Sequence, residues 1–437
     1  MGSQFDGLAQ VAEHISRLQI DIRTLRSIKL IDLRLTDGPL PIGKHCRRVH
    51  LDECREVIDG RIEILDGTVS DSQQYREYQA NIHRGVHYLS EQSTARVERV
   101  RAAVAEFLNA EAPEEIIFTS GTTESINLVA RAFADGVLKP GDRVLTTEME
   151  HRSNLVPWQE ACRRAGAEKL VVPMTDAGEL DMEELLRLLD AGPQLLAVTW
   201  VSNVLGTVNP LPLIIRMAHA VGCPVLVDAA QAMRHAPVDV RTLDCDFLCF
   251  SGHKMLAPTG VGVLYGKRRW LERLPPVHFG GGMIDEVDTA RATWAELPFK
   301  FEAGTPNIAG IIGLGAALDY LRGIGLPAIY ERESALTAYA EARLRERGDL
   351  DVLGAPARRA GAVSFNLRGL SYYDVAKLLD QLGVAVRSGH HCAQPLLAHF
   401  GLTGAVRVTP AFYNTREEID ALSAGLDRIA ALSGKGR

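Results

Sequence analysis

The segment Ser251-Gly252-His253-Lys254 has residue types that could do covalent chemistry, and it follows the apolar run Phe247 to Phe250. The run predicts a short buried strand, and Ala257 to Tyr265 predicts a Gly/Pro turn into a second apolar strand. A lone lysine is usually a surface charge. A lysine held in a partly desolvated site, however, favours its neutral amine, which attacks carbonyl groups. Lys254 is therefore a candidate to form a Schiff base with an aldehyde cofactor such as pyridoxal phosphate.

Asp228 is the acid that this chemistry needs, because it ends the apolar strand that begins at Pro224. A residue at the carboxyl end of a strand in an open α/β sheet points into the ligand crevice. A carboxylate there can keep the pyridinium nitrogen of pyridoxal phosphate protonated, which makes the ring an electron sink. Asp228 could instead cap the following helix, and both roles could hold together.

Two further segments carry chemistry. Ser120 to Thr123 follows a predicted strand, Glu115 to Thr119, and opens a helix, where backbone N–H groups and the helix dipole favour a phosphate; a plain capping turn is the alternative. Cys392 ends the polar segment Arg387-Ser388-Gly389-His390-His391-Cys392. Cysteine is usually a small buried hydrophobe, but neighbouring His and Arg residues favour a reactive thiolate.

Taken together, the motifs resemble the fold-type I, class V aminotransferase superfamily, and within it the group II (SUF-type) cysteine desulfurases, a branch that includes selenocysteine lyases. The resemblance runs from about Ile62 to the C-terminus. The motifs are Thr119 to Leu128, Glu150-His151, Ser202 to Gly206, Asp228 to Gln231, Ser251 to Lys254, Phe301 to Pro306 and Arg387 to Pro395. The resemblance implies a pyridoxal-phosphate-dependent enzyme that converts L-cysteine to L-alanine and passes sulfur, held as an enzyme persulfide, to an acceptor protein.

The same resemblance implies a role for each site residue. Catalysis is expected of Lys254, Cys392 and His151. Cofactor binding is expected of Thr122, Thr123, Ser251 and His253 at the phosphate, of His151, Asp228, Asn203 and Gln231 around the ring, and of Lys254. Thr305 matches a segment that reaches the phosphate of the neighbouring subunit, which implies a homodimer. Substrate binding is expected of Arg407, as a clamp on the carboxylate, and of His83 and Asn203.

Departures from the family pattern leave the substrate open. The turn Gly67-Thr68-Val69-Ser70 replaces a small-residue turn followed by Lys-Pro that borders the substrate in the family, and Arg152 replaces a second histidine. A selenocysteine lyase and a pathway-specific carbon–sulfur lyase therefore remain alternatives. An inactive sulfur-relay or scaffold protein of the same fold is a third, against which intact Lys254, Asp228 and Cys392 argue.

Alternating apolar strands and amphipathic helices from Arg143 to Val227 predict a mostly parallel sheet covered on both faces. With the resemblance, this implies an α/β fold: a large domain with a mostly parallel, seven-stranded-type sheet and a smaller α+β C-terminal domain. We expect an N-terminal extension of unclear role (1–61), a large cofactor-binding domain (62–305) and a small domain carrying Cys392 (306–437). In the small domain, strands are expected at Val352, Val363 to Leu367 and Val384 to Val386.

Bulk composition bounds the remaining possibilities. The chain has 437 residues, is 46% hydrophobic and carries a net charge of −7, which does not suggest a nucleic-acid or anionic-membrane partner. No apolar run approaches the ~20 residues of a membrane span, and the N-terminus lacks a signal-peptide core. Seven cysteines, an odd number, suit reduced thiols in the cytoplasm. His45, Cys46, His50 and Cys54 match no common zinc spacing, so no metal is expected.

Overall fold

The computed structural model describes residues 73–234 and 237–432. Several expectations lie outside these residues: the N-terminal extension (1–61), which includes the segment around His45 to Cys54, and the substrate-bordering turn Gly67 to Ser70. The described residues include every catalytic, cofactor-binding and substrate-binding residue predicted from the sequence.

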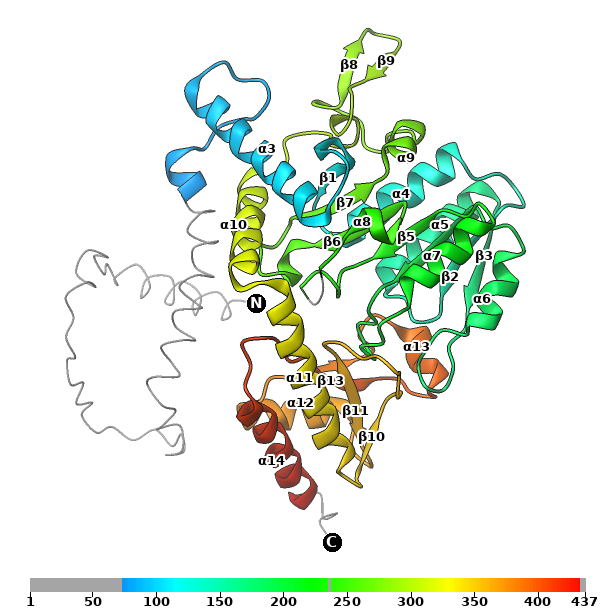
Figure 1. The fold of residues 1–437 in the computed structure, drawn as a ribbon, viewed down its shortest axis with the longest axis vertical. Helices are drawn as coiled ribbons and strands as arrows, with labels where there is room; N and C mark the ends of the chain where they lie inside the picture. Colours follow the sequence, from blue (N-terminus) through cyan, green and yellow to red (C-terminus); the bar gives the residue numbers. More distant parts are fainter. Residues whose placement is uncertain (1–72, 235–236, 433–437) are drawn as a thin grey trace, which may run out of the picture. The chain divides into compact units, whose positions relative to one another are not determined.

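A seven-stranded sheet forms the centre of the large unit, with strand order β1-β7-β6-β5-β4-β2-β3 (Figure 1). Only β7 runs against the others, pairing antiparallel with β1 and β6, while β6, β5, β4, β2 and β3 pair in parallel. The mostly parallel, seven-stranded prediction is therefore confirmed. The strands are β1 (Ile116–Thr119), β2 (Arg143–Thr147), β3 (Glu168–Val172), β4 (Leu195–Thr199), β5 (Val225–Asp228), β6 (Phe247–Ser251) and β7 (Gly262–Gly266).

Helices bury both faces of this sheet, which explains why its strands are apolar throughout. Successive residues of β5 alternate between two cores: Leu226 packs with Phe133 and Trp158, and Val225 and Val227 pack in the other core. The helices of the large unit are α3 (Tyr88–Leu108), α4 (Thr122–Gly136), α5 (Val156–Ala165), α6 (Met182–Leu189), α7 (Leu211–Ala220), α8 (Val240–Leu243) and α9 (Arg268–Arg273). Short 3₁₀ turns are η2 (Pro113–Glu115), η3 (Arg152–Asn154), η4 (Gly252–Lys254) and η5 (Phe299–Phe301), and a hairpin is formed by β8 (Ile284–Val287) and β9 (Ala292–Trp294).

A long helix pair connects this sheet to the second one. Helix α10 (Ile308–Ile324) packs on α3, and α11 (Leu326–Arg345) follows after a break at Gly325, whose φ of 93° suits glycine. Within residues 73–234 and 237–432, no single helix is both long and apolar enough to cross a membrane; only α10 and α11 together pass by length and composition, as a pair bent by 78°.

The C-terminal part is built on a four-stranded antiparallel sheet with its own apolar core, in the order β10-β11-β13-β12. The strand expected at Val384 to Val386 is wrong. Val384 and Val386 pack against this core, but the residues that pair with β13 are the polar ones that follow, so apolar character marked packing and not pairing. The elements are β10 (Leu350–Val352), β11 (Val363–Leu367), β12 (Arg387–Gly389), β13 (Ala405–Val408), α12 (Tyr372–Gln381), α13 (Gln394–His399) and α14 (Arg416–Leu432).

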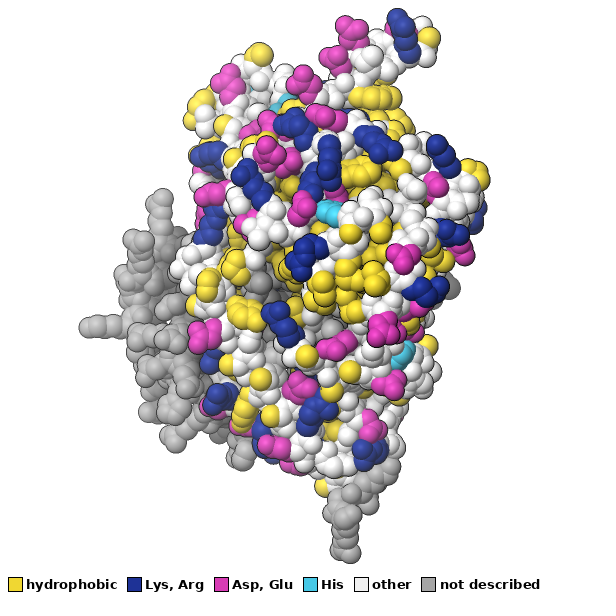
Figure 2. Space-filling model, turned by 45° about the vertical axis from the view of Figure 1, so that its right-hand side comes forward, with side chains coloured by type: hydrophobic (Ala, Val, Ile, Leu, Met, Phe, Trp, Pro, Cys, Tyr) yellow, Lys and Arg dark blue, Asp and Glu magenta, His cyan; other side chains and the backbone are white. Residues whose placement is uncertain are grey.

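The surface seen in Figure 2 mixes the two signs of charge: Lys and Arg side chains alternate with Asp and Glu, and apolar side chains lie between them. Such interspersed charge gives no extended field of one sign on this face.

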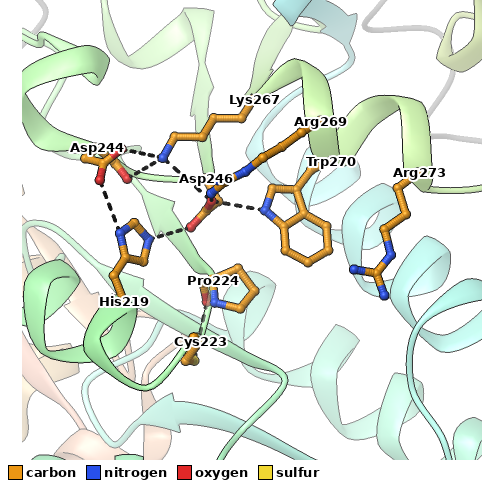
Figure 3. Close-up of a pocket in the computed structure, with 10 residues that line it drawn as sticks. His219, Cys223, Pro224, Asp244, Asp246, Lys267, Arg269, Trp270 and Arg273 are labelled. Carbon is orange, nitrogen blue, oxygen red and sulfur yellow. Dashed lines mark hydrogen bonds and ion pairs between the residues drawn. The ribbon is translucent and has the colours of Figure 1, made fainter.

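A buried carboxylate ties β6 to its neighbours at the amino end of the strand. Asp246 is fully buried, and its oxygens accept from Arg269 (2.6 Å), Trp270 (3.0 Å) and His219 (2.8 Å) and from the backbone N–H of Val225 (2.9 Å) (Figure 3). These donors come from α7, α9 and β5. Asp246 therefore fixes two helices and one strand to the strand that precedes Lys254.

Candidate active site

One cavity of about 550 Å³ lies beside the Asp246 cluster, but the predicted site residues gather in a different cavity, of about 540 Å³. Ten of them line this second cavity: Thr122, Thr123, His151, Asn203, Asp228, Gln231, Ser251, His253, Lys254 and Arg407. They come from segments far apart in the chain, most of which follow the carboxyl ends of sheet strands, where α/β sheets bind ligands. Lining residues that the sequence interpretation did not single out include Ser153, Thr199, Arg234, Arg387, His391 and Tyr413.

Several hydroxyl groups gather in the cavity lining at the start of α4. The Ser251 Oγ accepts from the backbone N–H of Thr122 (2.8 Å) and lies 2.8 Å from its Oγ1, while Thr123 Oγ1 lies 2.7 Å from Ser153 Oγ. The loops approach so closely that a Cβ at Gly262 would lie 2.4 Å from the Gly121 Cα, so only glycine fits there. Hydroxyls and helix N–H groups gathered in this way suit a phosphate.

Lys254 and Asp228 both line the cavity, and both are desolvated by burial. Burial lowers the pKa of Lys254, and the Asp228 charge opposes that shift. Burial raises the pKa of Asp228, against the opposing charge of Lys254 and the Ala230 N–H, which donates to Oδ1 at 2.9 Å. Asp228 ends β5 beside β6, the strand that leads to Lys254. A lysine whose pKa is lowered by burial, in the same cavity as a buried acid, is the arrangement expected for carbonyl chemistry.

His151 presents a neutral ring. Burial and the positive charges of Lys254 and Arg152 lower its pKa to about 4, and its Nδ1 accepts from the Ser153 N–H at 3.1 Å. A neutral imidazole with one nitrogen already bonded can lie against an aromatic ring without adding charge.

Glu150 precedes His151 and links this segment to neighbouring elements by hydrogen bonds. No role was predicted for Glu150 from the sequence. Its carboxyl is buried, and accepts from Thr147 Oγ1 (2.7 Å), the Thr199 N–H (2.9 Å) and Asn154 Nδ2 (2.6 Å). Burial raises the pKa of Glu150 to about 8. In the sequence, Glu150 stands out only because it precedes His151, and that position does not reveal these contacts.

Two arginines give another part of the cavity lining a positive charge. Arg407 on β13 pairs in register with Arg387 on β12, and its Nη1 donates to the Asn203 carbonyl at 2.6 Å. Its Nε is buried and has no hydrogen-bond partner among the described residues. Burial and the Arg387 charge lower the pKa of Arg407 to about 10. Because Asp228 is the only carboxylate among the described lining residues, this part favours an anion such as an amino-acid carboxylate.

Cys392 is partly buried and is not among the residues that line the cavity. It lies on a turn in which His391 and Cys392 both have positive φ, 48° and 58°. Its carbonyl accepts from the Arg152 N–H at 2.8 Å, and a negative charge on Cys392 would raise the pKa of both Lys254 and Arg407. The turn therefore places the thiol within electrostatic range of the cavity.

His83 and Thr305 lie elsewhere. They share a separate cavity of about 560 Å³ with Arg84 and Gly282, in which His83 Nε2 is 3.4 Å from Glu98 Oε1. Within one chain the structure does not bring them to Lys254, and their expected roles stay predictions.

The main cavity fits pyridoxal phosphate on its donor set. Hydroxyls and N–H groups suit the phosphate, a buried carboxylate suits the ring nitrogen, and a desolvated lysine suits the aldehyde. The described residues that line the cavity are therefore compatible with pyridoxal phosphate.

Comparison with known proteins agrees with this geometry. The model of the family "Aminotransferase class-V" matches residues 68–422. The chain is 51% identical over 362 residues to a cysteine desulfurase of Dickeya dadantii, covering 83% of this chain and 88% of that one.

Solved structures show the same fold. A cysteine desulfurase from Thermococcus onnurineus NA1 superposes with a TM-score of 0.80 at 38% identity, covering 84% of this chain and 91% of that one. The cysteine desulfurase CsdA of Escherichia coli, in an S-sulfonic acid form, gives a TM-score of 0.78 at 39% identity, with 84% and 92% covered. The sheet order, the composition of the cavity and these similarities lead to one conclusion: this chain belongs to the aminotransferase class-V family.

Proposed function

We propose that this protein is a pyridoxal-phosphate-dependent cysteine desulfurase, which converts L-cysteine to L-alanine and keeps the sulfur as a persulfide on Cys392. The observation that carries the proposal is the convergence of Lys254, Asp228, His151 and Arg407 on one cavity whose hydroxyl groups suit a phosphate. The 51% identity to a cysteine desulfurase supports the same activity.

Each part of the bound cofactor would contact different residues of the cavity. Thr122, Thr123 and Ser251 would hold the phosphate, His151 would lie against the ring, and Asp228 would hold the ring nitrogen in its protonated form. Pyridoxal phosphate, when bound, supplies an electron sink for the substrate carbon. Lys254 would anchor the cofactor through Nζ and then move the proton at the substrate Cα, a task suited to an amine whose pKa is lowered by burial.

Arg407 and Cys392 act on the substrate. The Arg407 guanidinium would bind the substrate carboxylate, which supplies the negative charge that this part of the cavity lacks. The Cys392 thiolate would form an S–S bond with the substrate sulfur while the carbon–sulfur bond breaks. The electron pair left on the substrate carbon is then protonated, which yields alanine.

The assay that tests the proposal follows alanine and sulfide from L-cysteine, with and without a reductant. Alanine in stoichiometric burst without reductant, and continuous turnover with it, is the expected result, because an acceptor must clear the persulfide. Equal turnover in both conditions, or release of a product other than alanine, would favour a direct carbon–sulfur lyase. A parallel reaction with selenocysteine distinguishes the lyase alternative that the sequence left open.

The proposal extends to the branch of the family, the partners and the location of the protein. We assign the chain to the group II (SUF-type) branch because of the motif Arg387 to Pro395, and expect a sulfur-acceptor protein, a homodimer and a cytoplasmic location. The homodimer is supported by the position of His83 and Thr305 together in a cavity separate from Lys254. Iron–sulfur cluster assembly is the pathway that this branch suggests.

A further inference from the structure

The turn that carries Cys392 is conformationally costly and is held by its neighbours. His391 and Cys392 occupy the left-handed region, which disfavours residues with a side chain. Two contacts fix His391: Asn203 Nδ2 donates to its carbonyl at 2.8 Å, and its Nε2 lies 2.9 Å from the Ala405 carbonyl. Among the described residues no hydrogen bond holds the Cys392 thiol itself, so the turn alone sets its direction.

Arg152 provides the remaining contacts to this turn. Its backbone N–H donates to the Cys392 carbonyl at 2.8 Å, and its Nη2 lies 2.9 Å from Nδ1 and 3.1 Å from Nε2 of His390. The Cys392 N–H also points to His390 Nδ1, at 3.4 Å. His390 therefore lies between the Arg152 guanidinium and the backbone of Cys392.

The guanidinium of Arg152 has no carboxylate partner within residues 73–234 and 237–432, and its Nε is buried without a hydrogen-bond partner there. A partly buried arginine that contacts only an imidazole gains little stability from ion pairing. Its position is, however, directly after His151, so one short segment contacts both the cofactor cavity and the cysteine turn.

We infer that Arg152 is a positioning residue whose guanidinium holds the His390 ring against the turn and thereby fixes the Cys392 thiol for sulfur transfer. This inference rests on the proposed desulfurase function. It assigns Arg152 and His390 to a single unit that acts through Cys392 and not through the cofactor.

Arg152→Met isolates the guanidinium. The variant keeps the backbone N–H that contacts Cys392 and much of the side-chain length, and it removes both the Nη2 contact to His390 and the unpartnered Nε. His390 Nδ1 keeps the Cys392 N–H as a donor. His390→Ala removes the other half of the contact. Arg163→Met is the matched control, because Arg163 on α5 is 74% exposed and, among the described residues, pairs with Glu160 at the surface.

The first readout is independent of catalysis: the rate at which iodoacetamide alkylates Cys392 in the cofactor-loaded protein, measured by mass spectrometry of its peptide. We expect Arg152→Met and His390→Ala each to change this rate about tenfold, and the double variant to match the singles, because both remove one contact. Arg163→Met should match the wild type.

The second readout is desulfuration of L-cysteine. We expect kcat to fall about tenfold in Arg152→Met and His390→Ala, with KM and the visible absorbance of the cofactor unchanged. Additive effects of the two substitutions, an unchanged alkylation rate, or a loss that appears in KM or cofactor absorbance would overturn the inference. If the wild type makes no alanine while the alkylation pattern holds, the contact to the turn stands and the proposed function fails.

Discussion

Lys254 is the residue at which burial and charge act in opposite directions. Burial favours the neutral amine, while Asp228 favours the ammonium, and the net effect is a lowered pKa. A lysine whose pKa is lowered by burial gives up its proton more readily than an exposed lysine, which suits both an anchor for an aldehyde and a group that moves protons.

Lys254→Ala should abolish the visible absorbance of covalently held cofactor and lower kcat/KM by about 10³-fold or more, because both tasks are lost. Borohydride treatment of the wild type should fix the cofactor on the peptide that contains Lys254. Full activity in Lys254→Ala would refute the assignment.

Cys392→Ala should separate sulfur transfer from cofactor binding. The thiol lies on a turn outside the cavity lining, so the variant should keep the wild-type cofactor absorbance and still bind L-cysteine. Mass spectrometry after cysteine treatment should show added sulfur on the Cys392 peptide of the wild type and none in the variant. The buried cysteines at 162, 223, 245 and 249 serve as internal controls; sulfur found on any of them would contradict the persulfide assignment.

Arg407→Lys should weaken substrate binding, because an ammonium group cannot form the bidentate hydrogen bonds that a guanidinium forms with a carboxylate. We expect KM for L-cysteine to rise about tenfold or more with the cofactor absorbance unchanged, as a charged hydrogen bond contributes about 1.5–3 kcal/mol. Cysteamine, which lacks the carboxylate, is the control: the wild type and the variant should handle it equally. A selective loss with cysteamine would argue against the clamp.

At the scale of elements, two packing arrangements position the site. Strands β5 and β6 deliver Asp228 and the Lys254 segment side by side, and the antiparallel pair β12–β13 aligns Arg387 with Arg407. The amino end of β6 is anchored by Asp246, whose contacts reach α7 and α9.

Asp246→Asn should therefore destabilise the fold by about 3 kcal/mol, because it removes a buried charge that accepts hydrogen bonds from Val225, Arg269, Trp270 and His219. Asp244→Asn, at a carboxylate whose side chain is 62% exposed, should cost less than about 1 kcal/mol. Denaturant unfolding monitored by circular dichroism measures both. Equal losses in the two variants would contradict the anchoring role.

The same residue predicts a direction of pH dependence. Burial acts to raise the pKa of Asp246, but the hydrogen bonds from Val225, Arg269 and His219 outweigh it and hold the pKa below its ordinary value of 3.8. The contribution to stability is therefore complete above about pH 4 and is lost as the pH falls through 3.8 towards the lower folded value. The difference between wild type and Asp246→Asn in free energy of unfolding should shrink over that acid range.

At the scale of the whole molecule, one chain supplies two cavities with predicted site residues. Lys254 lines one, and His83 and Thr305 line the other. In the homodimer we propose, the second cavity of one subunit would meet the first cavity of the other.

Subunit mixing tests this arrangement. Lys254→Ala and Thr305→Trp should each be inactive alone, and co-refolded mixtures should recover about a quarter of wild-type activity, because half of the dimers would carry one intact site of two. Light scattering should show a dimer for each variant. A wild-type monomer that turns over substrate, or no recovery on mixing dimeric variants, would count against the shared site.

The sequence by itself predicted ten of the residues that line the main cavity. Lys254, Asp228, Thr122 and Cys392 were identifiable because glycine-punctuated turns and polar residues after apolar runs are local features, and the apolar runs themselves predicted the parallel sheet. The resemblance to class V aminotransferases added roles for His151 and Arg407. Helix and strand positions were recovered because buried strands need continuous apolar runs and helices need one apolar face.

Tertiary structure decided what depends on residues distant in the chain. The lowered pKa of Arg407 depends on its burial and on Arg387 beside it, and the raised pKa of Glu150 depends on its burial. The Arg152–His390 contact joins positions 238 residues apart. The strand at Arg387–Gly389 was misplaced for the same reason, since pairing partners and not local hydrophobicity define an edge strand. Desolvation and backbone pairing are properties of the assembled fold, because both depend on which groups exclude water from which others.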